Sequence, residues 1–509
     1  MQPVCNKYIS MSDIKKLAGQ TAVYGLPTII GRFLNYFLVP LYTYNIMASE
    51  YGMVSELYAY VAFLMIILTY GMETAFFRYS QEYDKNKVFN TAMLSLLCST
   101  AVFLLITFIC LKPITSALEY QGHQSYIVLF LLILAVDTLK AIPYALLRSE
   151  NKAKRFALIK TTDIFANILF NLFFIALCPI LSRNPQFANM MCWFDASDLV
   201  FYIFLSNLLA CFIAMAMLLP EYKRFRWNFD FSLFTKMLSY GFPVMIGGLA
   251  GMVNETFDRI ALKHLVKSPN DLADISQVNS WKMAQIGIYG ACYKLSIVIS
   301  LFIQAFKFAA EPFFFSKMKK ADAKQSYSSV MTAFVMFLSL VFLVVMCYID
   351  VFQYFMGKEY RIGLAVVPIL LMANIFLGIY YNLSIWYKVT DKTKWGAIIA
   401  IIGAVVTLIG NYILVPQLSY MGAAITTLVC YVTIAIICYF IGQRYYTINY
   451  NVKRCLLYIF MAIGLYFISA FIRENALGLP LTLLINTILI IVYILIAYKL
   501  DIKRMIKER

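Results

Sequence analysis

Charged side chains inside apolar stretches are the residues of this sequence best placed to do chemistry. Arg32 and Lys294 each stand within a long apolar stretch, and Arg78 stands near the end of another. A charge buried in hydrocarbon is costly, so it usually faces a water-filled cavity or an opposite charge. Neither Arg32 nor Lys294 has a carboxylate nearby along the chain. Such cations are suited to bind an anionic group such as a phosphate or a diphosphate.

Oppositely charged residues also stand close together within these stretches. Asp137 and Lys140 are three residues apart, and Glu255 and Arg259 are four apart, so each pair shares one face of a helix. Two roles stay open for every such charge: a structural pair or bond between helices, and contact with substrate or with a coupling H⁺ or Na⁺. The candidate substrate-binding residues are Arg32, Lys294, Arg78, Arg259 and Lys140. The candidate ion-coupling residues are Asp137, Glu73, Glu255, Asp258 and Glu311.

Sequence motifs of common enzymes and metal sites do not occur in this chain. There is no Walker motif and no arrangement typical of a nucleophilic triad. The 11 cysteines are scattered without a Cys-x-x-Cys spacing, which indicates small apolar side chains rather than metal ligands. The two histidines, His123 and His264, fall in stretches that we predict to be loops. We therefore expect no catalytic residue, no metal site and no cofactor.

The elements that would hold these charges are membrane-spanning helices. Hydrophobic residues make up 62% of the chain and charged residues only 14%, and the mean hydropathy is +0.75. Apolar segments of about 20 residues recur along the chain, and each can cross the hydrocarbon core as a helix. We predict an all-α polytopic membrane protein with 14 transmembrane helices. The segments lie near 21–43, 53–77, 89–111, 126–147, 157–181, 198–220, 234–258, 286–310, 328–350, 364–387, 395–415, 420–441, 454–472 and 479–499.

The basic residues are distributed unequally between the connections of these segments. Most of the 43 lysines and arginines lie at the two ends of the chain and in every second connection. Cytoplasmic loops carry an excess of Lys and Arg, so this alternation predicts that both termini are cytoplasmic. The formal net charge of +17 then reflects orientation in the membrane. Nucleic acid is therefore not an expected partner.

A duplicated pattern predicts how the helices are grouped. Tyr24-Gly25-Leu26-Pro27-Thr28-Ile29-Ile30-Gly31 recurs as Tyr240-Gly241-Phe242-Pro243-Val244-Met245-Ile246-Gly247, and later matches follow in the same order. Copies six spans apart have the same orientation, which is a transporter design with the substrate site between two related bundles. We predict a polar insertion in the second copy, near 263–282. The predicted divisions are a cytoplasmic N-terminus 1–20, an N-lobe 21–225, a C-lobe 226–445, two extra helices in 446–500 and a cytoplasmic tail 501–509.

Several short motifs together resemble one transporter family. Ser49-Glu50-Tyr51-Gly52, then Gly71-Met72-Glu73-Thr74-Ala75-Phe76-Phe77-Arg78-Tyr79, then Glu311-Pro312-Phe313-Phe314 occur in this order. The chain resembles the Wzx-type polysaccharide and O-antigen flippases of the multidrug/oligosaccharidyl-lipid/polysaccharide (MOP) exporter superfamily. The resemblance implies translocation of an undecaprenyl-diphosphate-linked oligosaccharide across a bacterial inner membrane for lipopolysaccharide or other surface polysaccharide. It also implies a cationic cavity between two lobes, alternating access, coupling to H⁺ or Na⁺, and pathway partners such as a polymerase and glycosyltransferases.

Two other functions compete with the flippase hypothesis. A MATE-like ion-coupled drug antiporter of the same superfamily would need an anionic cavity for cationic drugs, whereas the isolated charges here are mostly positive. A membrane glycan polymerase or acyltransferase would generally need a large outer loop or a histidine within the membrane. The sequence favours a transporter over an enzyme.

Overall fold

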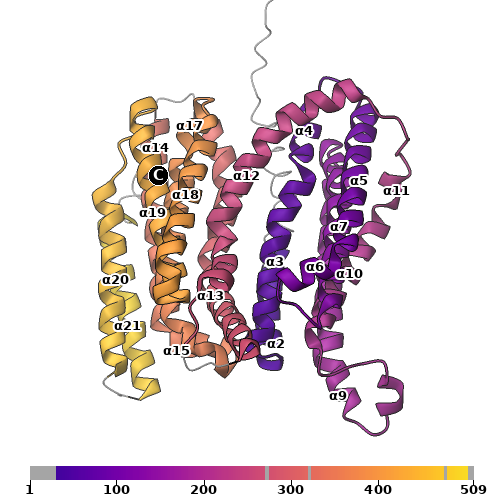
Figure 1. The fold of residues 1–509 in the computed structure, drawn as a ribbon. Helices are drawn as coiled ribbons and strands as arrows, with labels where there is room; N and C mark the ends of the chain where they lie inside the picture. Colours follow the sequence, from indigo (N-terminus) through magenta and orange to yellow (C-terminus); the bar gives the residue numbers. More distant parts are fainter. Residues whose placement is uncertain (1–29, 32, 270–273, 319–321, 475–477, 503–509) are drawn as a thin grey trace, which may run out of the picture.

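The computed structural model describes residues 30–31, 33–269, 274–318, 322–474 and 478–502, and these residues form helices without any β-strand (Figure 1). The first helices are α2 (Leu38–Asn45), α3 (Ala48–Thr69), α4 (Met72–Tyr79), α5 (Lys85–Ile109), α6 (Leu111–Ala117), α7 (Gln124–Ser149) and α8 (Ala153–Asn171). Next come η1 (Leu172–Leu177), α9 (Cys178–Ser182), η2 (Ala188–Met191), α10 (Leu199–Met217), α11 (Leu219–Tyr222), α12 (Phe231–Leu265) and α13 (Ile275–Lys317). The rest are α14 (Ala323–Cys347), α15 (Ile349–Phe352), η3 (Gln353–Phe355), η4 (Lys358–Val366), α16 (Val367–Leu383), α17 (Ile385–Val389), α18 (Lys394–Leu418), α19 (Tyr420–Tyr445), α20 (Val452–Glu474), α21 (Leu479–Ala497) and η5 (Tyr498–Ile502).

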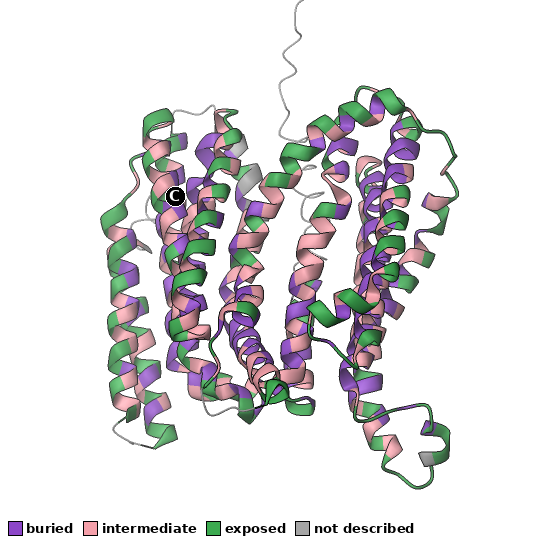
Figure 2. Cartoon of the chain, viewed as in Figure 1, coloured by how far each residue is buried: buried purple, intermediate pink, exposed green. Residues whose placement is uncertain are grey.

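The all-helical membrane architecture predicted from composition is confirmed. Among the described residues, 13 helices are long and apolar enough to cross a membrane, and each coincides with a predicted segment. Of the remaining predicted segment, 21–43, residues 21–29 and 32 lie outside the described residues, and its last part lies in α2. Apolar side chains also face outward, as expected for contact with lipid rather than water. Figure 2 shows exposed residues along the outer sides of the helices. On α20, for example, Phe460, Phe467 and Phe471 are each more than 60% exposed.

Local sequence explains where several helices begin. Asp84, Asp198 and Asp230 precede α5, α10 and α12, and each carboxylate accepts a hydrogen bond from a backbone amide three residues later. Such N-caps satisfy amide groups that have no partner within the helix. Between α3 and α4 the chain turns through Tyr70 and Gly71, which both have positive φ angles.

The helices form two groups joined by tight contacts. The N-terminal group, α2–α11, and the C-terminal group, α12–α21, stand next to each other in Figure 1. Helix α3 packs along both α12 and α13, and the Phe231 end of α12 curves over to reach α4 and α5. The two groups are thus in contact along α3, while α12 bridges them at one end.

Glycines permit the closest of these contacts. A Cβ atom added to Gly52 of α3 would lie 1.9 Å from the carbonyl oxygen of Met283 in α13. A Cβ atom added to Gly287 of α13 would lie 1.9 Å from the carbonyl oxygen of Ala48 in α3. Small residues allow membrane helices to approach at backbone distance. The interface between α3 and α13 therefore depends on having no side chain at these positions.

Two helices extend beyond the spans predicted from hydropathy. The segments 234–258 and 286–310 lie within α12, which ends at Leu265, and α13, which begins at Ile275. Much of the polar stretch near 263–282 is therefore helical, because polar residues can continue a helix past its apolar part. The prediction that His264 lies in a loop is wrong, since it occupies the last turn of α12.

Candidate functional site

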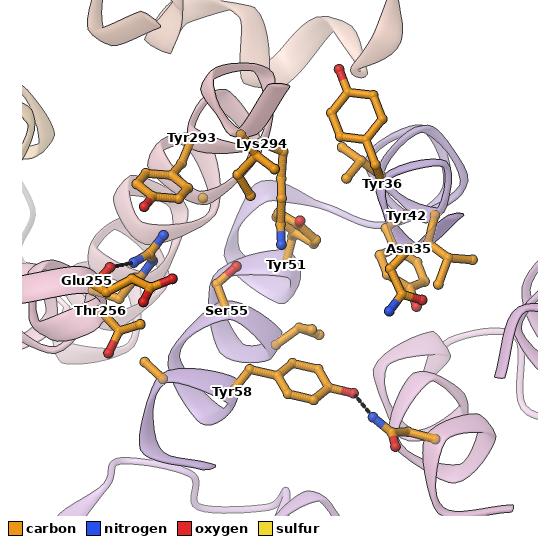
Figure 3. A pocket seen from close by; sticks show the side chains of 18 of the residues that line it. Asn35, Tyr36, Tyr42, Tyr51, Ser55, Tyr58, Glu255, Thr256, Tyr293 and Lys294 are labelled. Carbon is orange, nitrogen blue, oxygen red and sulfur yellow. Dashed lines mark hydrogen bonds between the residues drawn. The ribbon is translucent and has the colours of Figure 1, made fainter. Parts of the chain in front are cut away.

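A cavity of about 470 Å³, lined by charged, polar and apolar side chains, lies at the junction of the two helix groups (Figure 3). One wall is formed by α12 and α13. The facing wall is formed by α2, α3, α8 and α10 together with residues 35 and 36, and its α3 part adjoins α12 and α13, on which α3 packs. The size of the cavity falls within the usual range of ligand-binding pockets. The cavity thus occupies the position expected for a substrate site between two bundles.

The wall made by α12 and α13 carries the charges of the cavity. Glu255, Arg259 and Lys294, which we predicted as site residues from the sequence, all line it. Two cations and one carboxylate line this wall, and a second carboxylate, that of the buried Asp258, pairs with Arg259. Figure 3 shows Lys294 reaching into the space between the walls, opposite Tyr36 and Tyr42. This wall can therefore attract an anionic group.

Arg259 is held in place by its neighbours. Its Nη1 donates hydrogen bonds to the Asp258 carboxylate at 2.9 Å and to the backbone carbonyl of Glu255 at 2.7 Å. The guanidinium also lies 4.2 Å from the centre of the Tyr293 ring. Asp258 itself is buried and accepts a hydrogen bond from the Tyr289 hydroxyl. The guanidinium is thus oriented by Asp258 and Tyr293, and the Glu255 carboxylate stays exposed at the cavity.

The facing wall is built from amides, hydroxyls and tyrosines. Its polar lining comprises Asn35, Tyr36, Tyr42, Tyr51, Ser55, Tyr58, Asn167 and Asn207. None of these described side chains carries a formal charge. The Asn207 amide donates a hydrogen bond of 2.6 Å to the Tyr58 hydroxyl, joining α10 to α3. The two walls therefore differ sharply in chemistry.

Lys140 lies in a separate cluster inside the N-terminal group. The side chain is 3% exposed, and its ammonium lies 2.7 Å from a carboxylate oxygen of Asp137 and 3.5 Å from one of Asp163. The predicted pairing of Asp137 and Lys140 is confirmed. Neither residue lines the described cavity. Asp137 and Lys140 of α7 and Asp163 of α8 thus form a charge network between these two helices, with Lys160 of α8 nearby.

The remaining candidates lie away from the cavity or outside the described part. Glu73 pairs with Arg148 at 2.5 Å, and both side chains are more than 40% exposed. The Arg78 guanidinium lies 4.5 Å from the centre of the Tyr240 ring, where α4 meets α12. Arg32 lies outside the described residues, as does the side chain of Glu311.

One buried charge pair was missed by the sequence reasoning. Glu56 of α3 and Lys263 of α12 are almost fully buried, and the ammonium lies 3.0 Å from the carboxylate. The Tyr120 hydroxyl donates a second hydrogen bond of 2.7 Å to Glu56. Glu56 stands within an apolar segment, so its charge was a usable signal, as was that of Asp163. Lys263 gave no such signal, because it follows the apolar part of its helix.

Comparisons with known proteins agree with this architecture. Residues 17–318 match the family model described as polysaccharide biosynthesis protein. No curated protein sequence matches the chain.

Solved structures of transporters have the same fold. The structure entitled lipid II flippase MurJ, inward closed conformation, is 14% identical, with 94% of this chain and 98% of that chain covered and a TM-score of 0.68. An inward-facing MATE multidrug resistance transporter of the MOP superfamily is 15% identical, with coverages of 86% and 96% and a TM-score of 0.53. A MATE structure in complex with MaD3S is also 15% identical, with coverages of 84% and 96% and a TM-score of 0.57. At these identities the likeness is one of fold.

The family match covers more than half of the 509 residues, and the fold likeness spans nearly the whole chain. These neighbours are a flippase and transporters, not enzymes. The 13 helices that are long and apolar enough to cross a membrane indicate a multi-pass membrane protein. The chain therefore belongs to the polysaccharide biosynthesis protein family and is a multi-pass inner-membrane protein with the transporter fold of the MOP superfamily.

Proposed function

We propose that this protein translocates an undecaprenyl-diphosphate-linked oligosaccharide from the inner to the outer leaflet of a bacterial inner membrane. The observation that carries the proposal is the cavity between the helix groups, where Arg259 and Lys294 share one wall. Two cations that line one wall suit a diphosphate, which has several anionic oxygens to accept their hydrogen bonds. The lipid-linked substrate named for the MurJ neighbour supports the same substrate class.

The substrate's parts would experience different surroundings during translocation. The diphosphate and sugars would occupy the polar cavity, because moving them through hydrocarbon is costly. The polyprenyl tail would stay in the bilayer, along the apolar outer surface of the helices. Alternating opening of the cavity toward the two sides of the membrane would then carry the head group across.

We also propose the number of membrane spans, the side of the membrane on which the termini lie, and the division into two lobes. It comprises 14 transmembrane helices with cytoplasmic termini, an N-lobe 21–225 and a C-lobe 226–445 related by a parallel repeat, and two extra helices. Tyr51-Gly52 recurs in the second copy as Tyr289-Gly290. These pairs lie on α3 and α13, which pack together, and this supports the repeat. Glycosyltransferases and a polymerase of the same pathway are the proposed protein partners.

Coupling to H⁺ or Na⁺ would require a carboxylate that changes partners during transport. Glu255 faces the cavity, and Asp137 is one-third exposed although it pairs with Lys140. These two are the described candidates best placed for the role.

A drug antiporter is the second candidate, favoured by the fold likeness to MATE transporters. A cationic drug would need net negative charge in the cavity. The described lining instead has two cations and one carboxylate, which favours an anionic substrate.

Substitution of the proposed diphosphate-binding cations tests the function. In cells, Arg259→Gln and Lys294→Met should each abolish or strongly reduce surface polysaccharide at unchanged protein level. Losing a hydrogen bond to a charged group costs about 1.5–3 kcal/mol, or about 10- to 150-fold in affinity. Lys112→Met, which removes an exposed lysine of α6 that does not line the cavity, is the matched control and should retain polysaccharide. Normal polysaccharide in both charge variants would refute the proposal.

A further inference from the structure

We infer that the uncharged wall of the cavity is a binding site for the sugar next to the diphosphate, and that this sugar is uncharged. The inference rests on the proposed function and assigns the two walls to different parts of one substrate. The wall of α12 and α13 would bind the diphosphate. The facing wall, formed by α2, α3, α8, α10 and residues 35 and 36, would bind sugar hydroxyl or amide groups.

The separation of charge across the cavity is the first observation. Glu255, Arg259 and Lys294 supply every formal charge among the described lining residues, and all three stand on α12 or α13. A diphosphate gains most free energy beside the cations. An uncharged sugar gains no net coulombic attraction from them, but it can exchange hydrogen bonds with amides and hydroxyls on the facing wall.

The hydrogen bonds behind the uncharged wall are the second observation. The Asn171 amide donates to the Asn167 side-chain oxygen at 3.0 Å, and the Tyr42 hydroxyl donates to the Asn171 oxygen at 2.9 Å. Buried Asn171 thereby orients both lining residues. The Asn167 amide group keeps its two N–H donors, and the Tyr42 oxygen keeps its capacity to accept.

Tyr58 completes this set of donors and acceptors. Its hydroxyl oxygen accepts from the Asn207 amide at 2.6 Å, so its own proton can be donated into the cavity. Figure 3 shows the Tyr58 ring extending across the floor of the space, with Asn35 and Tyr42 beside it. Sugar hydroxyls both donate and accept, so they match a wall that offers both functions. A phosphate oxygen only accepts, so it matches the cations better.

The tyrosines also offer apolar surface beside their hydroxyls. Tyr36, Tyr42, Tyr51 and Tyr58 line the cavity with rings whose edges and faces are apolar. A sugar ring has C–H groups between its hydroxyls and is amphipathic in the same way. Rigid side chains with an apolar body and a polar tip bind such ligands at low entropic cost.

Binding measurements with matched ligands test the assignment. The probes are a shortened polyprenyl diphosphate and the same lipid carrying one glucose or one N-acetylglucosamine. Calorimetric titration of the purified full chain in detergent would give a Kd for each probe. Wild-type protein should bind the sugar-bearing lipids more tightly than the bare diphosphate.

Variants of the two walls should affect these ligands differently. Tyr58→Phe and Asn167→Leu should each weaken the sugar-bearing lipids about 3- to 10-fold, as expected for one hydrogen bond, and leave the bare diphosphate unchanged. Lys294→Met should weaken all probes by the same factor. The thermal unfolding midpoint of each variant shows whether it folds. If Asn167→Leu does not fold, Tyr58→Phe still tests the sugar site, because it removes only a hydroxyl group and keeps the ring.

The outcomes separate the two proposals. Equal affinity of wild-type protein for bare and sugar-bearing lipids, or equal loss for both in Tyr58→Phe, would overturn the sugar site. Failure of Lys294→Met to weaken the bare diphosphate would overturn the proposed diphosphate wall instead. A loss confined to sugar-bearing lipids in Tyr58→Phe would support the sugar site.

Discussion

Replacing Lys263 by methionine should destabilise the protein strongly, because it would leave a buried carboxylate without its cation. The Lys263 and Glu56 side chains are 1% and 0% exposed, and their charged groups lie 3.0 Å apart. The ammonium also donates a hydrogen bond to the carbonyl of Leu118. After the substitution Glu56 would keep hydrogen bonds from the hydroxyls of Tyr120 and Tyr60, which are uncharged donors. Removing one partner of a buried pair costs about 3–5 kcal/mol.

The double variant Glu56→Leu/Lys263→Met should recover most of this loss. Replacing both charges by apolar side chains removes the uncompensated carboxylate, and such replacements are often close to neutral. The Leu118 carbonyl and the Tyr120 hydroxyl would still each lose a partner, at about 1 kcal/mol per group. A charge swap, Glu56→Lys/Lys263→Glu, should recover less, because a carboxylate would then face the Leu118 carbonyl.

Thermal unfolding of the purified variants in detergent measures this order. We expect the highest midpoint for the wild type, followed by the apolar double variant, then the charge swap, and the lowest for Lys263→Met. Unfolding of a large membrane protein is not a simple two-state equilibrium, so the ranking and the coupling between sites are compared. An unchanged midpoint for Lys263→Met, or losses that simply add in the double variant, would refute the reasoning.

Other perturbations test contacts and charges elsewhere in the molecule. Gly52→Ala should lower the thermal midpoint, because its new Cβ would lie 1.9 Å from a backbone oxygen of α13, and overpacking costs about 1–3 kcal/mol or more. Gly251→Ala is the control, since its Cβ meets nothing within 4 Å. Lys140→Met should also lower the midpoint, by leaving two carboxylates without their shared ammonium; an unchanged midpoint would count against the network. A hydrogen bond from Lys87 lowers the pKa of Asp230, so this contact stabilises the fold above the unfolded pKa near 4 and is lost as pH falls further. Midpoints measured from about pH 6 to pH 3 should therefore decline less steeply in Asp230→Asn.

The positions of the helices follow from local properties of the sequence. An apolar segment of about 20 residues forms a membrane helix wherever it occurs, because lipid cannot satisfy the backbone's hydrogen bonds. The 13 described spans all coincide with predicted segments for this reason. Charges close along one helix are also local, and Asp137 and Lys140 pair as their spacing predicts. The short motifs likewise identified the superfamily whose fold the chain has.

Contacts between distant segments were decided by tertiary structure. Glu56 and Lys263 are 207 residues apart, and no local sequence pattern predicts that the packing of α3 and α12 brings them together. The cavity combines Arg259 and Lys294 with the amides of Asn167 on α8 and Asn207 on α10, which no sequence pattern predicted as site residues. Hydropathy determines that a helix crosses the membrane. The rotation of that helix about its own axis depends on how its side chains and glycines pack against neighbouring helices. The sequence alone thus determined which segments span the membrane and which charges they carry, whereas packing decided which charges face the cavity, which face one another, and which uncharged wall they meet.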